Sequence, residues 1–247
     1  IQVPTNDTWA RDSSAISVYE DEKPLLLDFD FTAWGGKFDA SLDNKMSQKL
    51  SSTYDAPMKI MDFILEGGAI ESNGKGTLLI TSECVFNPNR NRNLSKEEHL
   101  AILKESFGVS NILILNSGYL SGDDTDSHID TLARFTDEQT IVYLKCGDKD
   151  DEHYEALSAM EAELKEFTDQ DGQAFILVPL PFTRAIYDED ERLPATYANF
   201  LILDEAVLVP VYQDSHDGLA LKTLSGLFPK RDIIPIDCSA LVRQHGS

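Results

Sequence analysis

The sequence predicts an α/β fold, and three observations support this prediction. Short apolar runs rich in β-branched residues recur along all 247 residues, as they do in the strands of sheets. Amphipathic stretches with a helical period separate several of these runs. No Pro/Ser-rich linker or low-complexity tract interrupts the alternation, so the pattern indicates one domain rather than several.

The apolar runs are the expected strands, and some of them should pair in sheets. They cover residues 25–31, 77–86, 111–115, 140–146, 174–180, 200–211 and 233–236. No exact internal repeat is visible. Similar strand-and-helix units can nevertheless diverge beyond what one sequence reveals, so the sequence leaves a repeated architecture open.

Two expected helices carry the clearest signals. Ser95 begins the first through a capping box with Glu98, and Gly108 ends it. The second covers residues 150–167 and has an apolar face opposite a run of Asp and Glu. That apolar face consists of Leu157, Met160, Leu164 and Phe167. Both patterns are typical of helices that pack on a core, with a solvated acidic face on the second.

The charge of the chain limits its partners. A formal net charge of −22 argues against binding to nucleic acid or anionic membranes, because phosphate contacts need clustered Lys and Arg. Cationic ligands are favoured instead. No apolar run approaches the roughly 20 residues that span a bilayer, and the start IQVPTNDTWARD lacks the regions of a signal peptide. The sequence therefore predicts a soluble protein of the cytoplasm.

The three cysteines, Cys84, Cys146 and Cys238, are odd in number and widely spaced. They indicate neither a disulfide framework nor a C-x-x-C site, and this usage fits a reducing cytoplasm. Each lies in or beside an apolar run, where a buried and inert thiol is the common case. All three are therefore expected to lie outside any active site.

Four segments do not have the composition of core packing: residues 6–12, 65–77, 122–135 and 243–247. Asp-rich turns often only cap helices or close loops, so none is decisive alone. In the third segment an aspartate or histidine occupies every second position from 124 to 130, which predicts a strand with these side chains on one face. They are Asp124, Asp126, His128 and Asp130.

Ion and phosphate sites are poorly supported. An EF-hand counted from Asp124 would need Gly where Ile129 stands and Glu where Phe135 stands. His128 and Asp130 lack a second His or Cys at ligand spacing, so no metal site is expected. The glycines of EGGAIESNGKG do not end in the Gly-Lys-Ser/Thr of a phosphate loop, and predict a turn between strands.

Several motifs, taken in order, carry a specific resemblance. They are NDTWARD, EGGAIES with NGKGT, GDDTDSHIDTLARF, RLPATYANF and the final HGS. Together they resemble the landmarks of the bacterial agmatine deiminase family, peptidylarginine-deiminase-like enzymes of the guanidine-modifying pentein superfamily. The resemblance covers residues 6–247. It implies a pentein-type α/β propeller of repeated strand-helix units with pseudo-fivefold symmetry and a central active site.

The sequence departs from the family pattern in two ways. In the family a catalytic cysteine follows the HGS turn, and it would fall three positions after Ser247; the family also begins one strand-and-helix unit earlier. Residues 1–247 are thus expected to form a single catalytic domain that lacks an N-terminal unit and the nucleophile segment. Ser14 and Ala15 replace a usual Gly-Pro pair, which leaves the turn after Asp12 open but not its carboxylate.

The resemblance assigns roles to individual side chains. Asp12 and Asp130 would grip the guanidinium, since carboxylates accept its paired N–H donors. His128 would protonate the departing ammonia and then activate water. Glu66 would orient the histidine and favour its protonated form. Trp9 would flank the substrate chain, although core packing explains an aromatic residue there about equally well.

The implied enzyme is a hydrolase that converts agmatine and water to N-carbamoylputrescine and ammonia through a cysteine thiouronium intermediate, in putrescine and polyamine biosynthesis. No cofactor or metal is implied, and a homo-oligomer is compatible with the resemblance. An arginine or peptidylarginine deiminase or an amidinotransferase is the alternative, and a non-catalytic pentein-fold binding protein is a further one. Only Arg11 could meet an arginine α-carboxylate, and the acidic residues 188–191 would attract a cationic substrate.

Overall fold

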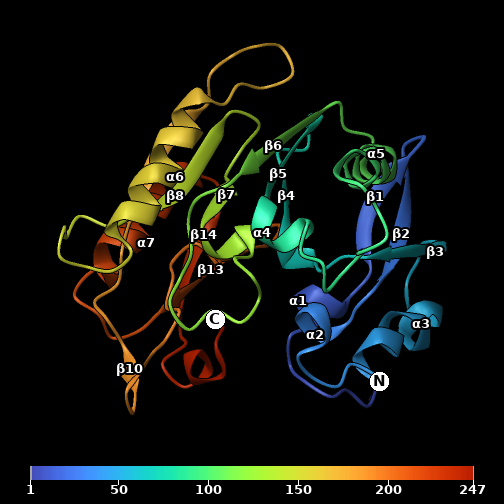
Figure 1. The fold of residues 1–247 in the computed structure, drawn as a ribbon, viewed down its shortest axis with the longest axis horizontal. Coiled ribbons are helices and arrows are strands. Elements are labelled where there is room, and N and C mark those ends of the chain that lie inside the picture. Colours follow the sequence, from blue (N-terminus) through green and yellow to red (C-terminus); the bar gives the residue numbers. More distant parts are fainter. Residues whose placement is uncertain (1, 247) are drawn as a thin grey trace.

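Four three-stranded sheets follow one another along the chain in the computed structural model, which describes residues 2–246 (Figure 1). In each sheet the first strand pairs antiparallel with the second, and the second pairs parallel with the third. The strands are β1 (Ile16–Glu20), β2 (Lys23–Asp30), β3 (Met58–Ile64), β4 (Ile70–Ser72), β5 (Thr77–Thr81), β6 (Asn111–Leu115), β7 (Ala133–Phe135), β8 (Thr140–Lys145), β9 (Ile176–Pro181), β12 (Leu201–Ile202), β13 (Ala206–Val211) and β14 (Asp232–Asp237). We call each sheet with its helices a unit.

Helices form the crossover inside every unit, because a parallel strand pair cannot be joined by a tight turn. The crossovers contain α2 (Ala33–Gly36) and α3 (Met46–Leu50), then α4 (Ser82–Val85) and α5 (Lys96–Phe107), then α6 (Tyr154–Glu166), and last α7 (Asp217–Leu227). The first crossover also contains the 3₁₀ turns η1 (Asp43–Lys45) and η2 (Ser51–Thr53). Outside the crossovers lie α1 (Ala10–Ser13), the hairpin of β10 (Tyr187–Asp188) and β11 (Glu191–Arg192), and the 3₁₀ turns η3 (Gly67–Ala69), η4 (Ile129–Thr131) and η5 (Leu241–Gln244). Within residues 2–246, every helix is too short or too polar to cross a bilayer.

The predicted α/β class is confirmed, together with the repeated strand and helix units that the resemblance implied. Both expected helices are present: the side chains and backbone of Ser95 and Glu98 form the capping box, and Gly108 ends α5 at φ 61°. The second expected helix is α6. Its buried residues are Leu157, Met160 and Leu164. The turn predicted within 65–77 joins the antiparallel strands β4 and β5.

Two expected strands have different limits in the structure. The run 77–86 leaves the sheet at Thr81, whose hydroxyl accepts the N–H of Cys84 and begins α4. Hydroxyl capping therefore ended a strand that apolar composition alone would have continued. The run 200–211 is divided into β12 and β13, which pair as a hairpin.

The strand expected along residues 124–130 was wrong. Asp126 and Ser127 have φ of 65° and 63°, a left-handed conformation that no strand contains, and the chain then turns into η4. Asp123 accounts for this turn, because its side chain accepts the N–H groups of Thr125 and Ser127. The alternation of polar residues comes from a turn with several side-chain hydrogen bonds, not from a pleat.

The apolar core forms two main clusters that hold the units rigid. One lies in the first two units and includes Leu78 and Ile80 of β5; the other joins the third and fourth units and also includes Leu79 of β5. The polar residues expected at the site lie in the stretches that precede, join or follow the units, although several apolar side chains of these stretches belong to the clusters. These stretches are residues 8–12, 66–69, 116–132, 193–200 and 241–246.

Candidate active site

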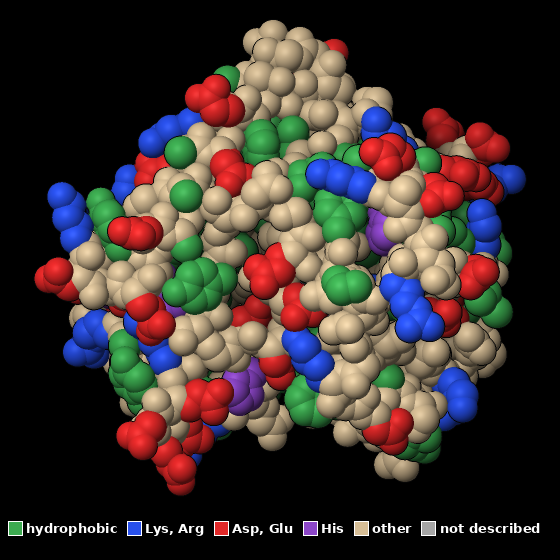
Figure 2. Space-filling model, viewed as in Figure 1, with side chains coloured by type: hydrophobic (Ala, Val, Ile, Leu, Met, Phe, Trp, Pro, Cys, Tyr) green, Lys and Arg blue, Asp and Glu red, His purple; other side chains and the backbone are tan. Residues whose placement is uncertain are grey.

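The connections between the units meet at a cavity of about 360 Å³, a volume typical of small-molecule sites. Side chains or backbone from four connections line it, among them Trp9, Asp12, His128, Asp130, Asn199 and Gly246. Glu66 lies beside His128 rather than on the cavity wall. In Figure 2 acidic side chains occur near the middle of the face as well as along its rim. The structure therefore brings together the four residues expected to perform the chemistry.

Asp12 is held by two donors, one from the connection between the first two units and one from the first crossover. The N–H of Gly68 donates to Oδ1 at 2.8 Å, and the indole Nε1–H of Trp34 donates to Oδ2 at 3.0 Å. Burial raises the pKa of Asp12; the charge of His128 opposes the rise, and that of Asp130 adds to it. Trp34 is buried, and its hydrogen bond to Asp12 could not be predicted from the sequence.

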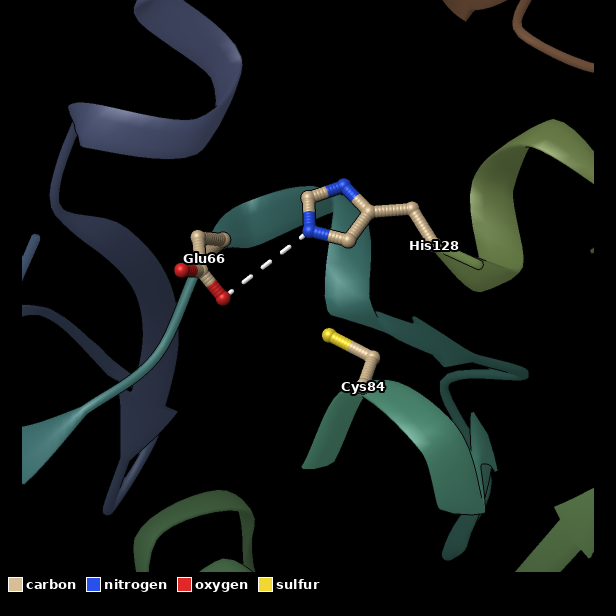
Figure 3. A group of neighbouring side chains, drawn as sticks. All are labelled: Glu66, Cys84 and His128. Atoms are coloured by element: carbon tan, nitrogen blue, oxygen red, sulfur yellow. Dashed lines mark ion pairs between the residues drawn. The ribbon is translucent and has the colours of Figure 1, made fainter. Parts of the chain in front are cut away.

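His128 lies at the start of η4, between two carboxylates. Its Nδ1 is 3.7 Å from Asp12 Oδ1, and its Nε2 is 3.8 Å from Glu66 Oε2 (Figure 3). Burial alone would lower the pKa of His128, but Asp12, with further contributions from Cys84 and Glu66, raises it well above its usual value. The raised pKa favours the protonated imidazole, which is the form that a general acid needs.

Glu66 is fully buried and is held by Arg90. The guanidinium Nε donates to both carboxylate oxygens, at 3.1 and 2.9 Å, and Nη1 donates to Asp126 Oδ2 at 2.7 Å. Burial by itself would raise the pKa of Glu66, but His128 and Arg90 lower it below its usual value. Arg90 was missed from the sequence, because a single arginine in an Asn-rich turn matches no motif.

Replacing Arg90 by glutamine is expected to lower the free energy of unfolding by about 3–5 kcal/mol, because it leaves the Glu66 charge buried without its partner. Urea titration measures the loss. The matched control is Lys75→Gln, which breaks an ion pair with Glu138 whose two side chains are 56% and 62% exposed and should cost below about 1 kcal/mol. Equal losses in the two variants would show that the Arg90 contact is no stronger than a surface pair.

Asp130 has one paired and one unpaired oxygen. Oδ2 accepts a hydrogen bond from Arg11 Nη1 at 3.0 Å, whereas Oδ1 is buried and has no hydrogen-bond partner among the described residues. Both Asp130 and Arg11 line the cavity. An unpaired buried carboxylate oxygen is costly, so a ligand that donates N–H groups would complete this side chain.

The C-terminal RQHGS segment reaches the same cavity. His245 Nδ1 donates to the carbonyl of Gly122 at 2.7 Å, which ties this segment to the connection that carries His128. A Cβ added at Gly246 would lie 2.5 Å from the ring of Trp9, so glycine permits close packing here. Trp9 therefore lines the cavity, as expected, and also packs against Gly246. Ser247 and the expected cysteine lie outside the described residues.

Cys84 does not lie away from the site, and this part of the sequence prediction was wrong. Its side chain in α4 is directed toward Glu66 and His128 (Figure 3). The thiol is fully buried, and burial raises its pKa, so the prediction of an unreactive thiol agrees with its surroundings. Cys146 and Cys238 are also buried and free, and neither lines the cavity. A fully buried thiol of raised pKa is a poor nucleophile.

Glu66, Cys84 and His128 are the one group in residues 2–246 whose ligand atoms are close enough to hold a metal, all within 4.8 Å of one another. The chemistry of the group favours another reading. Glu66 already binds the cationic guanidinium of Arg90 through both oxygens, and a second cation would be repelled there. An ion pair with protonated His128 uses the same carboxylate without that conflict.

The raised pKa of His128 predicts a pH-dependent contribution to stability. An imidazolium favoured in the folded protein stabilises it fully below the unfolded pKa of about 6.5, and this contribution is lost as pH rises through the folded pKa. The difference in unfolding free energy between the parent protein and His128→Asn should therefore shrink above pH 6.5, by up to about 1.4 kcal/mol per pH unit. Urea titrations from about pH 6 to 9 measure it. Parallel stability curves would contradict the assignment of a raised pKa.

Comparison with known proteins gives a consistent result. Residues 1–247 match the model of the Porphyromonas-type peptidyl-arginine deiminase family. An agmatine deiminase of Stutzerimonas stutzeri is 31% identical over 261 residues, which cover 96% of this chain and 71% of that protein.

Two solved structures superpose closely on the fold. One, from Porphyromonas gingivalis and provisionally described as an arginine deiminase, has a TM-score of 0.98 and 52% identity, and the match covers 100% of this chain and 74% of that one. The other is a C. jejuni agmatine deiminase with a cysteine-to-serine replacement and substrate bound. It has a TM-score of 0.95 and 45% identity, over 100% of this chain and 73% of that one. Both matches include every connection that lines the cavity.

Proposed function

Because the chain belongs to the Porphyromonas-type peptidyl-arginine deiminase family, we propose that it is a hydrolase that converts agmatine and water to N-carbamoylputrescine and ammonia, a reaction that belongs to putrescine biosynthesis. Relatives over 30% identical carry the name agmatine deiminase, and one was solved with its substrate. We propose further that residues 1–247 are one catalytic domain and that Asp12, Glu66, His128 and Asp130 carry the chemistry.

One observation supports this assignment above the others. A Cβ added at Gly68 would lie 2.5 Å from His128 Nδ1, 2.8 Å from Asp12 Oδ1 and 3.0 Å from Asp130 Oδ2. Two carboxylates and an imidazole thus converge on one small volume beside the cavity. Carboxylates in fork geometry bind a guanidinium through paired N–H donors, and the imidazole lies within reach of a nitrogen held there.

The proposed reaction needs a nucleophile from beyond Ser247. A cysteine thiolate attacks the guanidinium carbon, and a bond forms from sulfur to carbon. His128 gives its proton to one amino group, the carbon–nitrogen bond breaks, and ammonia leaves. The neutral His128 then takes a proton from water, and hydroxide adds to the thiouronium carbon. The carbon–sulfur bond breaks to restore the thiolate, and the added hydroxyl loses its proton to solvent, which releases the neutral ureido product. The cysteine-to-serine change in the substrate-bound C. jejuni relative supports a cysteine in this role.

Glu66 and the two aspartates have separate tasks in this scheme. Glu66, fixed by Arg90, favours the protonated form of His128 before ammonia leaves. Asp12 and Asp130 hold the guanidinium so that its carbon faces the nucleophile. This fixed orientation lowers the barrier to attack. Trp9 would flank the alkyl chain, since its half-buried ring lies on the cavity wall.

Substrate charge distinguishes the candidates within the superfamily. Arginine, which the provisional description of the P. gingivalis relative suggests, carries an α-carboxylate that needs a cation. Arg11 is the one Lys or Arg of the described chain that lines the cavity, and Asp130 already binds it. Asp123 and Asp124 also line the cavity and would attract the second ammonium of agmatine. These charges favour agmatine over arginine.

A non-catalytic binding protein is the candidate from another class. It would have no need to bury Glu66 and His128 as a charged pair, which costs free energy unless function requires it. Product analysis separates these candidates. The full-length protein should release ammonia and N-carbamoylputrescine from agmatine, with far less turnover of free arginine and peptidylarginine run in parallel. Faster turnover of arginine would identify arginine, not agmatine, as the substrate. No turnover of agmatine, arginine or peptidylarginine would favour the binding protein.

The acidic residues 188–191 of the β10–β11 hairpin are proposed to steer the cationic substrate toward the cavity. Neutralising all four as Asn or Gln should lower kcat/KM by about tenfold at low ionic strength, and the difference should fade near about 0.15 M salt. The control neutralises residues 20–22, at the β1–β2 turn on the opposite side of Figure 1. Unchanged rates and unchanged salt dependence would exclude steering.

Localisation and assembly remain predictions. The three cysteines are free in the structure, which suits a reducing compartment such as the cytoplasm. The net charge of −22 supports a protein that binds neither nucleic acid nor anionic membranes. A homo-oligomer stays open, and sedimentation of the full-length protein would test it.

A further inference from the structure

We infer that Arg11 is a positioning residue: anchored to Asn199 and Phe200, it binds one oxygen of Asp130 and so fixes the orientation in which this carboxylate meets the guanidinium of the substrate. This inference rests on the proposed function and deepens it. Arg11 is next to Asp12 in α1, and Asp130 is in η4. The two residues are therefore brought together only by the packing of separate units.

Arg11 is anchored to the connection that precedes β12. Its Nη1 donates to Asn199 Oδ1 at 3.3 Å as well as to Asp130, and its Nη2 donates to the carbonyl of Phe200 at 3.2 Å. A planar guanidinium that spans three acceptors in a fixed fork has little freedom to rotate. Arg11 thus links a substrate-binding carboxylate to the connection before β12.

The anchor itself is rigid. The carbonyl of Phe200 also accepts a hydrogen bond from Arg134 at 2.8 Å, and Arg134 lies over the Phe200 ring at 4.7 Å. Arg134 in turn pairs with the buried Glu71. A charged network of this kind holds its members in one arrangement when every group is satisfied. Arg11 therefore transmits a fixed position from this network to Asp130.

The environment of Asp130 shows why a fixed Arg11 matters. Its side chain is 5% exposed, yet Oδ1 has no hydrogen-bond partner among the described residues. Of the two oxygens, Arg11 thus engages Oδ2, and the carboxylate is held in one orientation. A carboxylate that was free to rotate would present either oxygen, and part of the binding energy would then go into orienting it.

The inference predicts a specific loss when Arg11 is replaced. Arg11→Gln removes the charge and the fork, so the affinity for agmatine should fall by about 10²-fold, and KM should rise more than kcat falls. Arg11→Lys keeps a charged donor to Asp130 but cannot span all three acceptors. Its affinity for agmatine should therefore be only about tenfold below that of the parent protein. The exposed Arg184→Gln is the control and should leave affinity unchanged. Thermal unfolding of each variant separates these losses from misfolding.

A double-mutant cycle with Asp130→Asn provides the decisive test. Isothermal titration calorimetry measures the affinity for agmatine in the full-length protein with its nucleophilic cysteine replaced by serine, so that no substrate is consumed, and the ammonia assay follows turnover for the same changes in the parent background. If Arg11 acts through Asp130, Arg11→Gln should cost little in the Asp130→Asn background. An equal cost in both backgrounds, or an unchanged affinity of Arg11→Gln, overturns the inference. Agmatine binding without turnover would contradict the proposed function alone. The absence of both binding and turnover would contradict the proposed function and this inference together.

Discussion

Replacing His128 by asparagine is expected to lower kcat for agmatine by about 10²–10⁴-fold, the usual contribution of a general acid and base. Asparagine is polar and similar in size but cannot release or accept a proton near neutral pH. One imidazole serves both half-reactions in the proposed scheme, so no second group can rescue either of them. Steady-state release of ammonia measures the loss, and mass spectrometry of quenched samples would detect any trapped thiouronium adduct.

The matched control is His216→Asn. His216 also faces a carboxylate, Asp214, at 3.1 Å, but its side chain is 43% exposed and it does not line the cavity. This variant should keep the parent kcat. If His128→Asn also kept it, His128 could not be the proton donor, and its contacts with Asp12 and Glu66 would be structural only.

Adding one methyl group at Gly68 is expected to lower kcat/KM by at least about 10²-fold. The methyl of Gly68→Ala would lie 2.5 Å from His128 Nδ1 and 2.8 Å from Asp12 Oδ1, closer than atoms can approach without moving. Displacing a reacting group by about 1 Å is enough to cost roughly 10²-fold in rate. Overpacking should also cost about 1–3 kcal/mol of stability, which a urea titration measures separately.

Gly147→Ala is the control for this substitution. A Cβ at Gly147 would meet no atom within 4 Å, and the backbone there is not left-handed. Its activity and stability should match those of the parent protein. If Gly68→Ala retained full activity, the convergence of His128, Asp12 and Asp130 on this volume could not be the geometry that catalysis requires.

Much of the fold could be predicted because local signals decide it. The capping box at Ser95 and the glycine at Gly108 set the ends of α5, and the buried strands follow the apolar runs. The repetition of the units was hidden. The pairing of each sheet needs apolar residues and a crossover but no particular sequence, so nothing preserves a visible repeat.

The site divides between residues with a motif and residues without one. Asp12, Glu66, His128 and Asp130 belong to ordered motifs, and the structure brings them together. Their partners could not be predicted. Arg90 meets Glu66 across 24 residues of chain, and Arg11 meets Asp130 across 119. Such contacts depend on how units pack, which no local pattern in the sequence records.

The misplacement of Cys84 has a related cause. An apolar run predicts burial, and burial is what the structure shows. Burial does not say which neighbours a side chain will have, and the cap at Thr81 turned this thiol toward His128 and Glu66.

Because the walls of the cavity come from separate parts of the chain, the molecule could be divided into two pieces that each carry part of the site. A cut at the exposed β10–β11 hairpin would leave Arg11 and Asp130 in one piece and their anchor at Asn199 and Phe200 in the other. Each piece would be inert alone. Catalysis recovered on mixing would report reassociation, so the chain is suited to fragment complementation, in which a returning signal marks the meeting of two parts.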